Sequence, residues 1–68
     1  MKQTAYILRD PKTDRWYVGT EWVDGGDLIH YAESTDQAKR YGDLNFAKSV
    51  AYYRGFEVYK LETKLEKV

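Results

Sequence analysis

The sequence predicts a small α+β domain: a three- to four-stranded antiparallel sheet with one helix packed on one face, in the order β-β-β-α-β. Three observations predict this class. Short runs of β-forming residues alternate with turn-forming clusters in the first half of the chain. One stretch in the second half repeats apolar residues at helical spacing, and a further run of β-forming residues follows it. A chain of 68 residues has room for a single domain, 1–68.

The first two expected strands form a hairpin. The run 4–9 is rich in β-forming side chains and stops at the turn cluster 10–14, in which Pro11 fixes a backbone angle suited to a turn. The apolar run 15–18 is then its antiparallel partner, and we expect that strand to end at Gly19.

The third expected strand covers 28–32 and follows a second turn. Asp24-Gly25-Gly26-Asp27 has the composition of a tight turn, because glycine adopts the positive φ values that such turns require. Three antiparallel strands in succession are the simplest interpretation of the first half of the chain.

Two helix signals follow the third strand. Ser34 and Thr35 are candidate N-caps for a short helix over 36–41, which Gly42 interrupts. Asp43 is a second N-cap, so we expect one helix that Gly42 can divide into two pieces.

The second piece is the clearest helix in the sequence. Its apolar residues recur at helical spacing and form one stripe: Leu44, Ala47, Val50 and Ala51. Gly55 is a C-terminal signal for this helix. The run 56–63 alternates as a strand does, and residues 64–68 extend as a polar tail.

Aromatic side chains are the main source of buried surface. Seven Tyr, two Trp and two Phe can each bury roughly 150–250 Å². Apolar residues fall on both faces of the expected strands, as in the neighbours Trp16 and Tyr17. Because one helix covers one face, the other face is a candidate interface for a second copy or another protein. The bland alternative is that tyrosines lie half-exposed there with their hydroxyl groups in water.

Composition argues against several kinds of site. The absence of cysteine excludes disulfides and thiolate metal ligands, and a single histidine, His30, does not make a zinc site without supporting carboxylates. The turn 24–27 lacks the ligand spacing of a calcium loop. We therefore expect no metal, no cofactor and no catalytic residues.

Charge and hydropathy indicate the setting. The net charge of zero argues against general polyanion binding. No apolar run approaches the roughly 18 residues of a membrane span, and Met1-Lys2-Gln3-Thr4 does not resemble a signal peptide. We expect a cytoplasmic protein without membrane contact.

The acidic residues are concentrated in one segment. Residues 19–38 contain five acidic residues and no Lys or Arg. Acids on a Gly-rich turn beside a tryptophan are compatible with a surface that docks into a basic groove. The alternative is that the segment is acidic because Asp and Gly form good turns and because the helix dipole favours acids near helix starts. The candidate partner-binding residues are those of this arm and one ring of the sheet: Glu21, Trp22, Asp24, Asp27 and Tyr17.

The sequence therefore favours a nonenzymatic protein-binding module that acts through the acidic Trp-bearing loop or an aromatic sheet face, and homodimerisation is compatible with it. The alternative is a single-stranded nucleic-acid-binding protein that stacks bases on the aromatic sheet face. The basic residues that would flank that face are Arg9, Arg15, Lys60 and Lys64.

One short pattern resembles the opening hairpin of the GIY-YIG endonucleases: Tyr6-Ile7 followed by Tyr17-Val18-Gly19. Ala5 stands where that family has Gly, and residues 20–23 stand where it places a catalytic Arg and a His. Because these catalytic positions differ, the resemblance does not imply nuclease activity, and we expect no enzyme.

The chain as a whole resembles a class of short, uncharacterised proteins encoded by phages and prophages of Gram-positive bacteria. The segments that carry this resemblance are Met1-Lys2-Gln3-Thr4, Tyr6-Ile7-Leu8-Arg9, Ile29-His30-Tyr31, 38–41 and Val58-Tyr59-Lys60-Leu61-Glu62. These segments contain structural residues, so the resemblance assigns no functional residues to this chain. It implies a phage accessory or inhibitor protein that binds a host or phage protein in the host cytoplasm.

Overall fold

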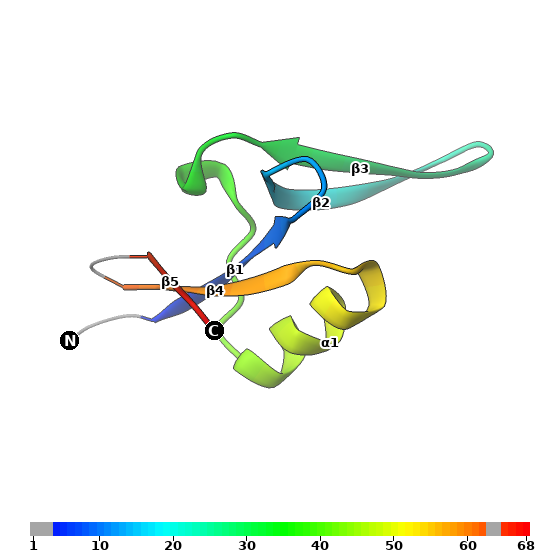
Figure 1. The fold of residues 1–68 in the computed structure, drawn as a ribbon. Coiled ribbons are helices and arrows are strands. Elements are labelled where there is room, and N and C mark those ends of the chain that lie inside the picture. Colours follow the sequence, from blue (N-terminus) through cyan, green and yellow to red (C-terminus); the bar gives the residue numbers. More distant parts are fainter. Residues whose placement is uncertain (1–3, 63–64) are drawn as a thin grey trace.

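The structure is a computed structural model that describes residues 4–62 and 65–68. Its elements run in the order β1 (Ala5–Asp10), β2 (Arg15–Val23), β3 (Gly26–Ala32), the 3₁₀ turn η1 (Thr35–Gln37), α1 (Leu44–Arg54), β4 (Glu57–Leu61) and β5 (Leu65–Lys67) (Figure 1). The strands form one antiparallel sheet in the spatial order β3-β2-β1-β4-β5. The predicted α+β class and the order β-β-β-α-β are confirmed.

The sheet contains one strand more than the sequence predicts. β5 forms where a polar tail over 64–68 is expected, and it pairs with β4 so that Leu65 lies opposite Leu61. The backbone N–H of Val68 continues the pairing by donating to the carbonyl oxygen of Val58 at 3.0 Å. Residue 64 lies outside the described residues. Most of the expected tail is therefore the edge of the sheet.

The prediction that the second strand ends at Gly19 is wrong, because β2 continues to Val23. Tyr17 pairs with Tyr31 and Gly19 pairs with His30, so the register shifts between the two pairs. Such a bulge bends a strand and increases its twist without ending it. The bulge lets β2 and β3 extend together as a long hairpin beyond the rest of the sheet (Figure 1).

The predicted glycine turn closes this hairpin. Val23 pairs with Gly26, so Asp24 and Gly25 form the loop. Gly25 has φ +92° and Gly26 has φ +145°, values that L side chains rarely adopt. The two glycines therefore allow the strands to remain paired up to the tip.

The predicted helix over 36–41 is wrong. Only the turn Thr35–Gln37 is helical there, and the hydroxyl of Ser34 caps it by accepting a hydrogen bond from the Asp36 N–H at 3.2 Å. The chain is then extended at Ala38, and the N–H of Lys39 donates to the carbonyl of Tyr17 at 3.0 Å. Long-range backbone hydrogen bonds replace the local ones of a helix.

The pairing of β1 explains why this segment is extended. β1 and β2 pair only at Arg9 with Trp16 and at Asp10 with Arg15. The earlier part of β1 therefore has backbone groups that β2 does not satisfy. Tyr6 and Tyr41 satisfy them by exchanging two backbone hydrogen bonds of 2.8 and 2.9 Å. Buried backbone groups require such partners, so the tertiary pairing outweighs the local helix signal.

The main helix has the predicted ends and the predicted inner face. The carboxylate of Asp43 caps α1 by accepting a hydrogen bond from the Asn45 N–H at 2.9 Å, and Gly55 ends it in the left-handed region at φ +76°. Ala47 and Ala51 are buried, and the rest of the predicted stripe packs at the margin of the same core. The helix lies against β1 and β4 (Figure 1).

The core has two parts because β1 is buried on both faces. Leu8 points toward α1, where the core cluster comprises Leu8, Tyr17, Tyr41, Ala47, Ala51 and Val58. Ile7 points to the opposite face, where it packs with Trp16 and Ala38. The segment after η1, which contains Ala38, therefore covers part of the face that α1 leaves open.

The aromatic side chains on that second face are not an open surface. Trp16 is buried, and the ring of Tyr59 packs edge-on against it with the centroids 5.2 Å apart. The expectation of an uncovered sheet face is therefore wrong around Trp16. The segment that contains Ala38 covers this face, and the ring of Tyr59 on β4 packs against Trp16.

Candidate functional site

The first candidate surface is the end of the β2–β3 hairpin, residues 20–29, which we call the acidic hairpin. It projects away from α1 and β4 (Figure 1). The radius of gyration is 12.0 Å, whereas a compact chain of this length has about 11 Å. The side chain of Trp22 is 76% exposed at this end of the molecule, and Val23 and Leu28 are also exposed.

Four of the five predicted partner-binding residues meet on the acidic hairpin: Glu21, Trp22, Asp24 and Asp27. Trp22 pairs with Asp27, so an acid lies beside the exposed ring on the same face. Glu21 is on the opposite face, where its carboxylate lies 3.2 Å from Nε2 of His30. The hairpin therefore presents carboxylates on both faces.

Tyr17 does not belong to this exposed group. It is 6% exposed at the base of the hairpin, and its ring packs against Phe56 at a centroid distance of 5.4 Å. Its hydroxyl shares a hydrogen bond of 2.7 Å with the Thr20 hydroxyl. Tyr17 is therefore a core residue and not an exposed ring of the hairpin, and its neighbour Trp16 is a core residue on the opposite face of β2.

The second candidate surface was not predicted from the sequence. An open surface cleft of about 440 Å³ lies between the base of the hairpin and α1, and we call it the hairpin–helix cleft. Its principal lining residues are four rings and two cations: Tyr17, Tyr41, Phe46, Tyr53, Lys39 and Arg54. A second cavity of about 390 Å³ shares Tyr53 and Arg54 with it. Each has the size of a ligand pocket.

One sequence signal could have indicated this cleft. Phe46, Ser49, Val50 and Tyr53 line it from α1 and follow the i, i+3, i+4, i+7 spacing of one helix face. This second stripe lies beside the core stripe of Ala47 and Ala51. The rest of the cleft comes from segments far apart in sequence, which no local pattern brings together.

The two cations of the cleft lie over aromatic rings. The guanidinium of Arg54 is 5.9 Å from the ring centroids of Tyr17 and Tyr53, and the ammonium of Lys39 is 5.9 Å from that of Tyr41. Within residues 4–62 and 65–68, neither cation forms an ion pair with a carboxylate. The cleft is therefore basic as well as aromatic.

Two tyrosines near the cleft, Tyr41 and Tyr31, stay neutral near pH 7. Burial raises the pKa of Tyr41 above its usual value of 10.0. Burial also raises the pKa of Tyr31, and the carboxylate of Asp10 raises it further. Neither Tyr41 nor Tyr31 is therefore a phenolate that would offset the positive charge of Lys39 and Arg54 at this pH.

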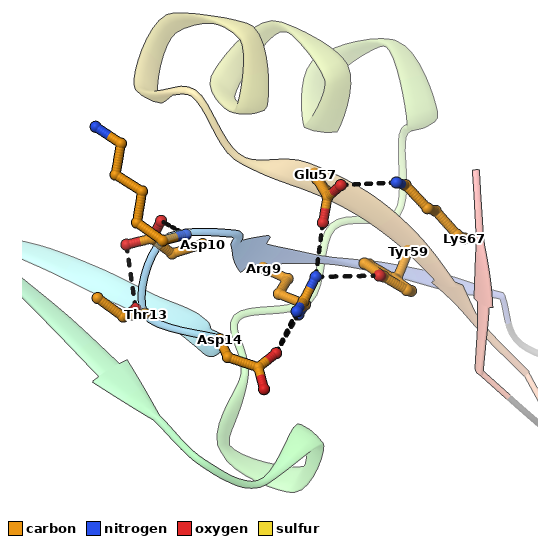
Figure 2. A network of polar contacts seen from close by, with 8 residues as sticks. Arg9, Asp10, Thr13, Asp14, Glu57, Tyr59 and Lys67 are labelled. Atoms are coloured by element: carbon orange, nitrogen blue, oxygen red, sulfur yellow. Dashed lines mark hydrogen bonds and ion pairs between the residues drawn. The ribbon is translucent and has the colours of Figure 1, made fainter.

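The opposite face of the sheet has a network of ion pairs centred on Arg9 (Figure 2). Arg9 Nε donates to Oδ1 of Asp14 at 2.7 Å, and Arg9 Nη1 donates to Oε1 of Glu57 at 2.8 Å. Lys67 Nζ donates to the other Glu57 oxygen at 2.7 Å. Arg9, which the nucleic-acid hypothesis uses as a phosphate contact, is thus engaged by carboxylates.

Glu57 links three strands, so its charge should affect stability. The hydrogen bond from Lys67, with a further contribution from Arg9, holds the pKa of Glu57 below its usual value of 4.5. A carboxylate with a lowered pKa stabilises the fold above its unfolded-state pKa, and this contribution disappears as the pH falls through the folded-state pKa. Glu57→Gln should therefore lower the melting temperature at pH 7 and have little effect well below pH 4.

Thermal unfolding followed by circular dichroism across this pH range tests the prediction. Glu33→Gln is the control, because it makes the same chemical change as Glu57→Gln at an exposed position. Equal pH profiles for the Glu57→Gln variant and the wild type would show that the network does not stabilise the fold.

Comparisons of the chain with protein-family models, with curated proteins and with solved structures find no match. In the part of the chain that the structure describes, no helix has the length and apolar character needed to cross a membrane. In the same residues no three His, Asp or Glu side chains are grouped as metal ligands. The acidic hairpin and the hairpin–helix cleft are the two candidate functional surfaces of the described residues.

Proposed function

We propose that this protein is a nonenzymatic protein-binding module that holds its partner with the acidic hairpin. The observation that carries the proposal is the exposure of Trp22, 76%, at the end of a hairpin that projects from the core. Tryptophan is enriched among the residues that contribute most to protein interfaces, and its ring loses a large solvated area on binding. An exposed ring in this position suits an anchor residue.

The charges around Trp22 define the kind of partner. Asp24 and Asp27 lie at the same end of the hairpin, and residues 19–38 contain no Lys or Arg. A single-sign surface speeds association with a partner of opposite charge and disfavours acidic partners. The partner we propose has a basic groove with an apolar or aromatic floor that accepts the indole ring.

The phage resemblance supplies a setting for this activity. Under it, the protein is an accessory or inhibitor protein that binds a host or phage protein in the host cytoplasm. No catalytic step is part of the proposal.

Affinity capture from a host lysate tests the role of the hairpin. The wild type should retain a partner that the Trp22→Ala, Asp24→Asn, Asp27→Asn triple variant loses, because the anchor ring and the steering charges are removed together. Tyr52→Ala is the matched control: its ring is 91% exposed on α1 and lies outside both cavities. Circular dichroism should show that all three proteins are folded.

A captured partner allows a second measurement with purified components. The association rate should fall as ionic strength rises, and less steeply for Asp24→Asn with Asp27→Asn. Recovery of the same proteins by the wild type and the triple variant would contradict the proposal.

A further inference from the structure

We infer that the hairpin–helix cleft receives the acidic hairpin of a second copy of this chain, so that two copies bind each other reciprocally. The inference rests on the proposed function of the hairpin and names its partner. It joins two surface features that the fold itself does not require: an exposed tryptophan among acids, and an aromatic cleft whose cations have no carboxylate partner in the part of the chain that the structure describes.

Charge complementarity is the first argument. The cleft presents Lys39 and Arg54, which have no carboxylate partner among the described residues. The hairpin presents Asp24 and Asp27, which also form no ion pair there. The chain has a net charge of zero, so two copies do not repel each other overall. Opposite charges would therefore meet when a hairpin enters a cleft.

Aromatic complementarity is the second argument. Tyr53 is 84% exposed and Phe46 is 58% exposed, although both line the cleft. Trp22 is the most exposed tryptophan and lines neither cavity of its own chain. An indole ring inserted from a second copy would cover the rings that the chain itself leaves in water.

Symmetry is the third argument. Thr20 and Trp22 lie two residues apart beyond the bulge of β2, so their side chains share one face of the hairpin. Thr20 lines the cleft, so Trp22 points to the side of the molecule on which the cleft opens. The acidic hairpin that inserts and the cleft that receives it therefore lie on one side of the chain, an arrangement that suits a closed two-fold dimer.

A charge-swap experiment tests the reciprocal dimer. Asp24→Lys with Asp27→Lys puts a basic hairpin opposite a basic cleft, and Lys39→Glu with Arg54→Glu puts an acidic hairpin opposite an acidic cleft. Each double variant alone should therefore sediment as a monomer at concentrations at which the wild type is a dimer. An equimolar mixture of the two should form dimers, because both of its hairpin-and-cleft contacts again join opposite charges.

Two adjacent tyrosines of α1 provide a control that leaves the charge unchanged. Tyr53 lines the cleft and Tyr52 does not, yet the two side chains are similarly exposed. Tyr53→Ala should raise the dissociation constant of the dimer about tenfold, because an interface anchor is lost. Tyr52→Ala should leave the dissociation constant unchanged. Circular dichroism of each variant separates a binding defect from unfolding.

The outcomes distinguish this inference from the proposed function. A wild type that stays monomeric at hundreds of micromolar overturns the inference, and Trp22-dependent capture of a different protein would leave the proposed function standing. The inference is also wrong if the Lys39→Glu, Arg54→Glu double variant still forms dimers by itself. Dimers that need the cleft but survive in Asp24→Lys with Asp27→Lys would contradict the role of the hairpin itself. Salt-sensitive binding of a labelled oligonucleotide to a monomer, abolished by Arg54→Glu, would assign the cleft to nucleic acid instead.

Discussion

Leu8→Ala should leave a large fraction of the protein unfolded at 25 °C. Leu8 is fully buried on the central strand, opposite Val58 of β4, and it belongs to the core beneath α1. Truncation of a buried leucine costs roughly 2–5 kcal/mol, because the lost contacts leave a cavity that the surrounding structure fills only in part. Domains of this size are stable by only about 3–5 kcal/mol. Urea unfolding followed by far-UV circular dichroism measures the loss.

Leu28→Ala is the matched control for this prediction. It makes the same chemical change on the hairpin, where Leu28 is 47% exposed. Its effect should stay within about 0.5 kcal/mol, as for most exposed positions. Equal destabilisation by the two substitutions would show that the core is not organised around β1.

Signals within a few residues of each other predicted the helix and the turns correctly. Asp43 and Gly55 fix the ends of α1 by hydrogen-bonding geometry and by a positive φ, both of which depend on residue type. Gly25 and Gly26 close the hairpin for the same reason. These features need no knowledge of the rest of the fold, which is why the sequence predicts them.

Features that depend on a distant partner were missed. Nothing local shows that β2 passes through Gly19, because the bulge there exists only in relation to His30 of the neighbouring strand. The short helix expected over 36–41 is replaced by pairing with Tyr6, which is thirty-five residues away from Tyr41. In both cases tertiary hydrogen bonds outweigh a local preference of about 1 kcal/mol or less per residue.

The two candidate surfaces also differ in whether their residues are close together in the sequence. The acidic hairpin is continuous in sequence, so composition alone located Glu21, Trp22, Asp24 and Asp27. The hairpin–helix cleft combines β2, the segment 39–41 and α1. The second stripe of α1 could have indicated one wall of it, but only the three-dimensional structure brings the other two segments to that wall. Tyr17 combines the two: the sequence suggests an interface ring, whereas the structure shows a core residue that also lines the cleft.

Ala47→Asp should unfold the domain outright. Ala47 is fully buried on the face by which α1 packs against β1 and β4, among apolar side chains and tyrosine rings. Protein interiors are close-packed, so a larger side chain has no space there without displacing the helix. A buried carboxylate without a cationic partner costs several kcal/mol in addition, and the total exceeds the stability of so small a domain.

Asn45→Asp introduces the same carboxylate in the same helix and serves as the control. Asn45 is exposed in the first turn of α1, where the helix dipole favours a negative charge. The melting temperature of the Asn45→Asp variant should therefore remain close to that of the wild type. Far-UV circular dichroism and thermal unfolding compare the two variants. A folded Ala47→Asp variant with a wild-type melting temperature would mean that α1 presents another face to the sheet. In that case the orientation of Phe46 and Tyr53 toward the cleft would also be wrong, because both are fixed by the same helical phase.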